Sequence, residues 1–190
     1  FSKHLDLLGL SLEETGQDIK RMGFDGVELT VRPGGRIEPH EVENKLPDAV
    51  ASSYCGVGNP FSAAKIDKGE QVLDVGCGAG VDAIIASMMT GPTGRVVGID
   101  LVPEMIGKAE THLKMTDQKN VAFQKTSGED LSFPEKTFDV VISNGVINLI
   151  PDKERALSEI FRVLKPGGRL SVADQAASGG IQKDLKARLA

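Results

Sequence analysis

Three glycines and two aspartates have the residue types and spacing of a ligand-binding site. The stretch "VLDVGCGAG" runs from an apolar segment into glycines spaced two residues apart, at Gly76, Gly78 and Gly80. Glycine permits positive φ and lets a bulky ligand lie close to the main chain. Asp74 precedes the first glycine, and Asp100 follows the last by twenty residues, where a carboxylate can accept hydrogen bonds from both ribose hydroxyls. The pattern indicates a ribose-containing ligand; a tight strand-to-helix turn that binds nothing is the alternative.

Segments typical of strands and helices alternate from residue 70 onward and would position these residues. We expect strands at 71–76, 95–100, 121–126, 138–145 and 169–174, and helices at 81–90, 103–115, 152–164 and 181–190. Such alternation predicts right-handed βαβ units around a parallel sheet, and ligands bind such sheets at the carboxyl ends of the strands. The sequence therefore predicts an α/β fold with a Rossmann-like, doubly wound parallel sheet and the glycine loop at its ligand-binding end.

Residues 1–50 differ in their sequence pattern from the alternating segments that follow. They predict a helix, a strand and a short helix at 11–23, 26–31 and 38–46. The segment "PDAVASS" (47–53) is the expected boundary. We therefore expect a βα extension at 1–50 and a larger α/β domain at 51–190.

Composition and charge argue against several functional classes. The 190-residue chain carries a net charge of −5, which disfavours nucleic-acid binding because phosphate contacts need Lys and Arg. Its longest apolar stretch, near "VVISNGVINLI", is too short and too polar to span a bilayer. Two cysteines, Cys55 and Cys77, lie in different segments and the three histidines form no cluster, so neither a disulfide framework nor a metal site is expected. A cytoplasmic protein with a small-molecule substrate is the default expectation.

The spacing of the glycines separates two classes of cofactor. Dinucleotide-binding proteins use G-x-G-x-x-G, which would place the last glycine at position 81, where this chain has Val81. This mismatch argues against an NAD-dependent oxidoreductase. The observed G-x-G-x-G, with Asp74 ahead of it, resembles motif I of the class I S-adenosylmethionine (SAM) methyltransferases.

The resemblance continues along the chain. "QVLDVGCGAG", "RVVGIDLVPEMIGKAE", the run from "SGEDLSFPEKTF" to "LKPGGRL", and "SVAD" look like the successive motifs of that family, over roughly residues 52–178. The chain is most similar to the arsenite methyltransferase-like subgroup, because of "NPF" and "VISNGVINLIPDKER", and next to the quinone-biosynthesis C-methyltransferases. The resemblance implies SAM as cofactor and methyl transfer to a small-molecule acceptor.

The resemblance also implies roles for individual residues. The glycines at 76, 78 and 80 would shape the pocket for the methionyl part, Asp74 would orient its amino group, and Asp100 would hold the ribose. Leu101 and Met105 would border the adenine, Glu129 would lie near the adenine amino group, and Asn144 would face the methionine moiety and the transferred methyl. For Glu129 a solvated loop is the alternative.

The segment "SSYCGVGNPF" (52–61) would, by the same resemblance, fold over the cofactor; an irregular linker is the alternative. No catalytic base is identified. Tyr54, Cys55 and Asn144 are the candidate catalytic residues. Where the arsenite subgroup has two cysteines, this chain has Val57 and Gly145, so the arsenic activity is not expected to carry over.

Both ends of the chain depart from the family pattern. The sequence stops at Ala190, before the antiparallel strand pair that normally follows the fifth strand, so we expect a truncated core whose open sheet edge permits a homodimer. Residues 1–50 resemble the start of a xylose-isomerase-like sugar isomerase/epimerase barrel, which two strands cannot close. The chain is then either a recombined or engineered chimera, which keeps the SAM-binding fold with little or no activity, or a methyltransferase with an unusual natural extension.

Overall fold

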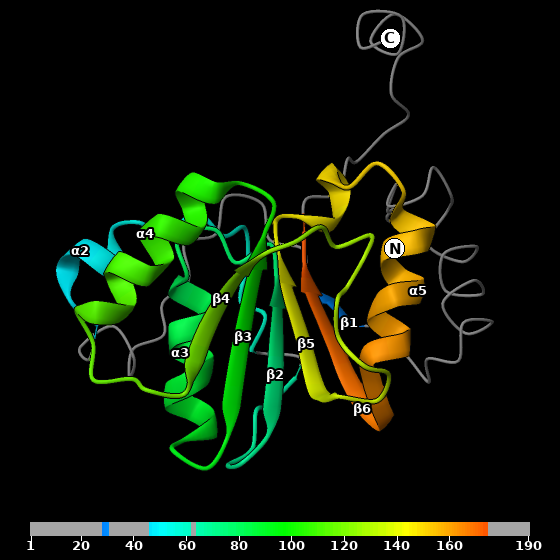
Figure 1. Ribbon diagram of the computed structural model, residues 1–190, viewed down its shortest axis with the longest axis horizontal. Helices are drawn as coiled ribbons and strands as arrows, with labels where there is room; N and C mark the ends of the chain where they lie inside the picture. The colour runs from blue at the N-terminus through cyan, green and yellow to red at the C-terminus, as the bar shows by residue number, and fades with distance from the viewer. Residues whose placement is uncertain (1–27, 31–45, 62–63, 175–190) are drawn as a thin grey trace, which may run out of the picture.

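A parallel six-stranded sheet forms the centre of the structure (Figure 1). The computed structural model describes residues 28–30, 46–61 and 64–174. The strands are β1 (Glu28–Thr30), β2 (Gln71–Val75), β3 (Arg95–Asp100), β4 (Val121–Lys125), β5 (Phe138–Asn144) and β6 (Leu164–Ala173), in the spatial order β1-β6-β5-β2-β3-β4. All neighbours in this sheet run parallel. From β2 the chain builds β3 and β4 on one side and then β5 and β6 on the other, so the strand order reverses next to β2.

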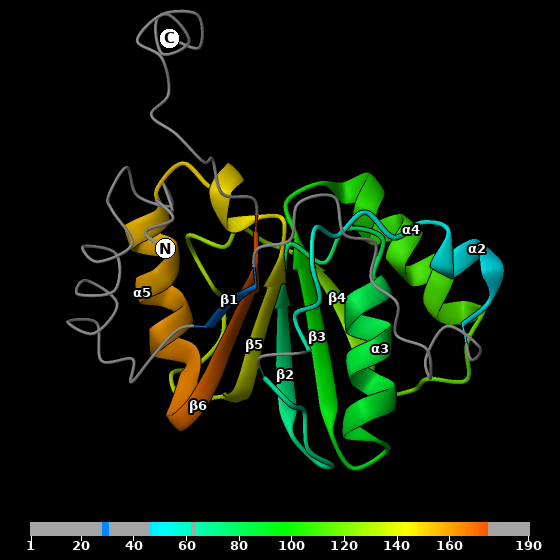
Figure 2. The ribbon, with the colours of Figure 1, turned by 180° about the vertical axis from the view of Figure 1, so that it is seen from behind.

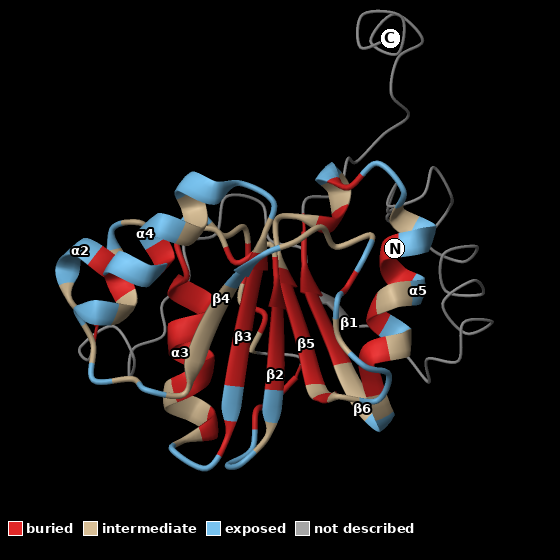
Figure 3. Cartoon of the chain, viewed as in Figure 1, coloured by how far each residue is buried: buried red, intermediate tan, exposed pale blue. Residues whose placement is uncertain are grey.

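Helices cover both faces of this sheet (Figures 1 and 2). They are α2 (Asp48–Ala51), α3 (Val81–Thr90), α4 (Pro103–Lys114) and α5 (Lys153–Val163), with a 3₁₀ turn, η2 (Ile147–Leu149). Ile160 of α5 belongs to the cluster that contains Leu73 of β2, whereas Ala83 of α3 packs in a second cluster with Val72. Because Leu73 and Val72 are neighbours in one strand, these clusters lie on opposite faces. Figure 3 shows the central strands buried, and the predicted doubly wound α/β fold is confirmed.

The helices begin where local sequence signals predict. Asp152 accepts the N–H of Arg155 at 3.0 Å and so caps α5. Pro103 occupies the first turn of α4, where its missing N–H leaves no intrahelical hydrogen bond unmade. One face of α5 is buried, at Ala156, Leu157 and Ile160, and the following Leu164 is buried as well.

The start of β6 differs from the prediction. The sequence predicts that "KPGG" separates α5 from a strand at 169, but the strand begins at Leu164. Phe138 pairs with Leu164 and Val140 with Arg169, so residues 165–168 bulge from the ladder. The glycine-containing turn is therefore an irregular part of the strand, because pairing with β5 is made on both sides of it.

One predicted strand of the extension lies beside β6. Glu28, Leu29 and Thr30 pair with Ser171, Val172 and Ala173, which confirms the strand expected at 26–31 over these three residues. Strand β1 thus pairs with the β6 edge over these three residues, and the homodimer expected through an open sheet edge stays a prediction. The other elements expected in residues 1–50, and the helix at 181–190, lie outside the described residues. The division at residue 50 stays a prediction, and the short helix α2 forms inside the segment expected as the boundary.

The described residues contain neither a helix that could span a membrane nor a cluster of metal ligands. Within these ranges no helix has both the length and the apolar character that crossing a membrane requires. The same residues contain no group of three or more His, Cys, Asp or Glu side chains arranged to hold a metal ion.

Candidate functional site

The loop between β2 and α3 turns sharply and leaves one side of its backbone open. Its glycines have positive φ, of 76° at Gly76, 52° at Gly78 and 84° at Gly80. A Cβ at Gly76 would overlap the side chain of Val146, whereas a Cβ at Gly78 would meet nothing within 4 Å. Packing therefore requires the first glycine, while the second faces open space at the carboxyl end of β2. This end lies where the strand order reverses, which is where open α/β sheets bind ligands.

Asp100 holds the same loop from the end of β3. Its Oδ2 accepts the N–H of Gly78 at 2.9 Å, and its Oδ1 accepts the N–H of Val102 at 2.9 Å. Each carboxylate oxygen can accept a second hydrogen bond. The structure thus brings Asp100 and Gly78 together and leaves the carboxylate able to receive hydroxyl donors.

Asp74 points from β2 into the first turn of α3. Its side chain is 1% exposed and accepts the N–H of Ala83, while its Oδ2 has no hydrogen-bond partner among the described residues. Burial, followed by repulsion from Asp82 and Asp100, raises the pKa of Asp74 well above its ordinary value. A buried carboxyl oxygen without a partner is costly, so Asp74 is a candidate for contact with a ligand.

Asp82 is a second buried carboxyl that the sequence reasoning missed. It lies in the first turn of α3, is 7% exposed, and its Oδ1 has no partner among the described residues. Its Oδ2 accepts the amide N–H of Asn144 at 2.9 Å. Burial raises the pKa of Asp82 to about 6, and the hydrogen bond from Asn144 opposes this rise. No sequence signal marks the residue, because an acid in the first turn of a helix is ordinarily explained by the helix dipole.

Asn144, at the end of β5, connects Asp82 to the segment that contains Tyr54. Its Oδ1 accepts the N–H groups of Val57 at 2.9 Å and Gly58 at 3.1 Å. Its Nδ2 lies 2.7 Å from the hydroxyl of Tyr54 and 3.0 Å from the carbonyl oxygen of Gly58. One side chain therefore fixes residues 54–58 beside the glycine loop.

The other two candidate catalytic residues, Tyr54 and Cys55, differ in solvent exposure. Tyr54 is half-buried and its hydroxyl donates to Gly58 O at 2.7 Å; burial, followed by the Asp82 charge, raises its pKa. Cys55 is a free and exposed thiol, whereas Cys77 is free and buried within the glycine loop. Burial raises the pKa of the Cys77 thiol, which therefore stays protonated and is not a nucleophile at neutral pH.

His112 supports the loop from α4. The buried ring places Nδ1 2.8 Å from the carbonyl oxygen of Ala79, so this nitrogen carries the proton and donates. Nε2 lies 3.4 Å from the Ser53 hydroxyl, just before the segment 54–58. His112 thus has a structural role, because it connects Ala79 in the glycine loop to Ser53 at the start of segment 54–58.

Known proteins match this chain over the region that contains the site. The family described as "Methyltransferase domain" matches residues 66–190, more than half of the 190 residues. This protein belongs to that methyltransferase family. The arsenite methyltransferase of Halobacterium salinarum is 40% identical over 131 residues, which are 69% of this chain and 34% of that protein. The demethylmenaquinone methyltransferase of Symbiobacterium thermophilum is 30% identical over 152 residues, 73% of this chain and 61% of that protein.

Solved methyltransferase structures share the fold. The crystal structure of an arsenic(III) S-adenosylmethionine methyltransferase from Chlamydomonas reinhardtii has a TM-score of 0.65 and 36% identity, over 71% of this chain and 48% of that one. The resemblance to the class I SAM methyltransferases is therefore confirmed, with SAM as the cofactor of the family. The chain spans from about a third to three fifths of the length of the two curated relatives.

The expected adenine-binding residues of this chain lie near the same end of the sheet. Leu101, directly after β3, is 64% exposed, and Met105 is half-buried in the first turn of α4. Glu129 contacts other protein groups: its Oε1 accepts the N–H of Asp152 at 2.8 Å, and the Ser127 hydroxyl donates to its Oε2 at 3.3 Å. The adenine role of Glu129 stays a prediction, because this carboxylate already connects its loop to the start of α5.

The residues present fit the cofactor of the family. SAM carries an ammonium group, a sulfonium and a ribose diol. The site offers open space over Gly78, a carboxylate at Asp100, and two buried carboxyl oxygens, of Asp74 and Asp82, that have no partner in the described part of the chain. The ammonium, the sulfonium and the ribose diol of SAM are complementary to these groups in charge or in hydrogen bonding.

Proposed function

We propose that this protein is a methyltransferase that binds SAM at the glycine loop and transfers its methyl group to a small-molecule acceptor. The open backbone of Gly78, near buried oxygens of Asp74 and Asp82 that lack a partner within the described ranges, is the observation that supports this proposal. A ligand without an ammonium or similar cationic donor group would leave the charge of these carboxyl groups uncompensated, and a dinucleotide would bring negative phosphates toward them. SAM, a cationic adenosyl amino acid, brings an ammonium group and no phosphate, so it avoids both problems.

The proposed role of the protein is to bind and align the reactants. Bound SAM supplies an electrophilic methyl group on a sulfonium for in-line displacement. Asp100 accepts the ribose hydroxyls, Gly78 permits close approach of the methionyl part, and residues 54–58, held by Asn144, exclude water. Leu101 and Met105 border the adenine. We assign no general base, which this transfer requires only when the acceptor must lose a proton.

We propose an acceptor other than arsenite. A Cβ at Gly145 would lie 3.3 Å from Cγ1 of Val57, so the two positions that carry cysteines in the arsenite subgroup are neighbours. With glycine and valine there, Cys55 is the remaining exposed thiol of this region. Trivalent arsenic is a soft acceptor that needs several thiolates, which one cysteine cannot supply.

Calorimetric titration followed by a transfer assay tests the function. The full chain is titrated with SAM, with its demethylated product S-adenosylhomocysteine and with NADH, and we expect binding of the first two. Methyl-labelled SAM is then incubated with arsenite, a small thiol and a demethylated quinone, and we expect a labelled product from a non-arsenic acceptor. Failure to bind SAM, or binding of NADH in its place, overturns the proposal. Binding without transfer to any acceptor favours the inactive-chimera alternative.

A further inference from the structure

Two buried carboxyl groups meet at the start of α3, and no cationic side chain among the described residues is their partner. Asp74 and Asp82 are 1% and 7% exposed, and each has one oxygen with no hydrogen-bond partner among the described residues. The remaining oxygen positions are occupied, by the N–H of Ala83 at Asp74 and by the amide of Asn144 at Asp82. Burying a carboxylate without a partner costs on the order of several kcal/mol, because the charged group loses its hydration. A ligand that brings positive charge and several donors would complete both groups.

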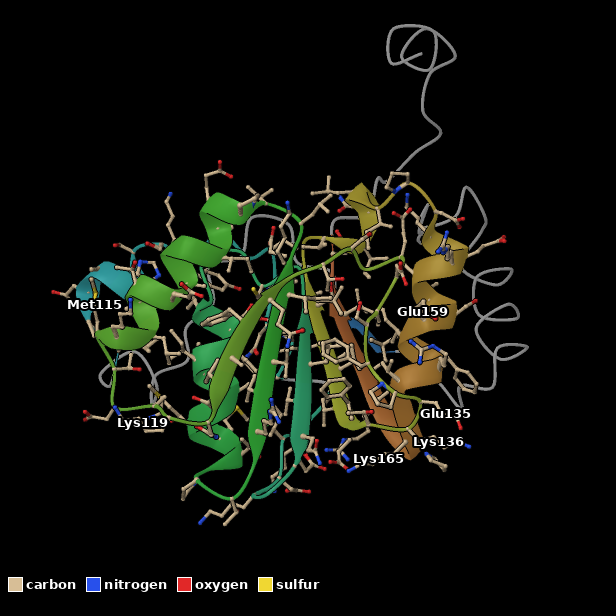
Figure 4. All side chains as sticks on the ribbon, viewed as in Figure 1. Met115, Lys119, Glu135, Lys136, Glu159 and Lys165 are labelled. Atoms are coloured by element: carbon tan, nitrogen blue, oxygen red, sulfur yellow. The ribbon has the colours of Figure 1, made fainter. Side chains whose placement is uncertain are left out.

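Among the residues that the structure describes, the groups that face this pair add no positive charge. Asp100 at the end of β3 adds to the repulsion on Asp74. Burial raises the pKa of Tyr54 and of the Cys77 thiol, so both are neutral at physiological pH. The ion pairs of Lys165 with Asp139 at 2.8 Å and Arg169 with Glu70 at 2.7 Å involve the other end of the sheet, where Figure 4 labels Lys165. The electrostatic field at the pair thus favours a compact cation.

We propose that Asp82, together with Asp74, directly binds the α-ammonium group of SAM, and that Asp82 couples this contact to the segment 54–58. The inference rests on the proposed function and adds a residue to it. An ammonium group has three N–H donors and no acceptor, which suits two oxygens that lack donors. Hydrogen bonds between charged partners are about twice as strong as neutral ones.

Asn144 connects the proposed contact between Asp82 and the ammonium group to the segment 54–58. Asp82 uses its Oδ2 for Asn144 and keeps its Oδ1 for the ammonium. The same Asn144 side chain accepts the N–H groups of Val57 and Gly58 at 2.9 and 3.1 Å. A ligand that fixes the Asp82 carboxylate also fixes the Asn144 amide, and thereby protects these two backbone N–H groups. A ligand without the amino-acid end leaves them unchanged.

Replacement of Asp82 tests the assignment with two ligands. S-adenosylhomocysteine carries the ammonium group, and 5′-methylthioadenosine has the same nucleoside without it. In Asp82→Asn we expect the affinity for S-adenosylhomocysteine to fall roughly 10- to 100-fold and that for methylthioadenosine to change less than about twofold. Asp67→Asn, an exposed carboxylate remote from the loop, is the matched control and leaves both affinities unchanged. Equal losses for both ligands, or no loss for either, overturn the inference.

The unmodified protein provides a second measurement that does not depend on how the variant folds. Hydrogen exchange at Val57 and Gly58 slows with S-adenosylhomocysteine but not with methylthioadenosine if the coupling exists. Deaminated S-adenosylhomocysteine, which lacks the ammonium, binds as weakly as methylthioadenosine. Equal protection by all three ligands overturns the inference while the proposed function stands. Absence of binding by SAM and S-adenosylhomocysteine overturns the proposed function as well.

Discussion

The amide nitrogen of Asn144 donates a hydrogen bond to the hydroxyl of Tyr54 at 2.7 Å, across 90 positions of sequence. The Tyr54 hydroxyl in turn donates to the carbonyl oxygen of Gly58 at 2.7 Å. Segment 54–58 is thus held to the end of β5 by a small number of polar groups. Each of these groups gives a separate test of how the segment is fixed.

Replacement of Tyr54 by Phe removes one of these groups and keeps the ring. The hydroxyl contacts with Asn144 and Gly58 are lost, so we expect the free energy of unfolding to fall by about 1 kcal/mol. Urea denaturation measures this change. Hydrogen exchange at residues 57 and 58 should accelerate, and an unchanged exchange rate would show that the hydroxyl does not hold the segment.

Replacement of Asp100 by Ala is expected to weaken the binding of SAM and of methylthioadenosine to a similar extent. Both ligands contain the ribose, and the carboxylate also accepts the N–H of Gly78. We expect a loss of roughly 10- to 100-fold for each in calorimetric titration. Asp100→Asn, which keeps one acceptor oxygen, should retain part of the affinity. A loss restricted to SAM would place Asp100 at the amino-acid end instead of the ribose.

Alanine at Gly76 and at Gly78 should have different effects on stability. At Gly76 the new Cβ overlaps Val146 in a residue with φ of 76°, so we expect a loss of about 2–4 kcal/mol. At Gly78 the φ of 52° is unfavourable but space is open, so the loss should be about 1–2 kcal/mol. Gly107→Ala, within α4 and in open space, is the control and should gain up to about 1 kcal/mol. Equal losses at both loop positions would contradict the packing argument.

The stability of the ligand-free protein should depend on pH through Asp82. Burial raises its pKa from 3.8 to about 6 in the folded state, so between these values the folded state binds more protons than the unfolded state. Stability contributed by this group is therefore fully present below pH 4 and is lost as pH rises through about 6. Asp82→Asn should gain on the order of 2–3 kcal/mol at pH 8 and little at pH 4, in urea denaturation at both values. An equal effect at the two pH values would exclude this origin.

The glycine loop and Asp100 could be predicted from the sequence because their signal is local. The glycine spacing predicts the turn, and the position of Asp100 at the end of the next predicted strand places its carboxylate beside that turn. Asp82 could not be predicted, because its partner Asn144 is 62 residues away and a helix-start acid has an ordinary explanation. The contact of Asn144 with Val57 is equally non-local, across 87 residues. The start of β6 was missed because strand pairing with β5 continues past glycines that locally favour a turn.

The pairing of β1 with β6 has a consequence for assembly. A strand of three residues contributes few ladder bonds, so we expect it to separate from the sheet at a small fraction of the free energy needed to unfold the whole protein. Separation would uncover backbone donors and acceptors along Ser171–Ala173, and the same strand of a second copy offers an identical sequence to cover them. We therefore expect exchange of this strand between two molecules, and so a reciprocal dimer, to be favoured as the protein concentration rises.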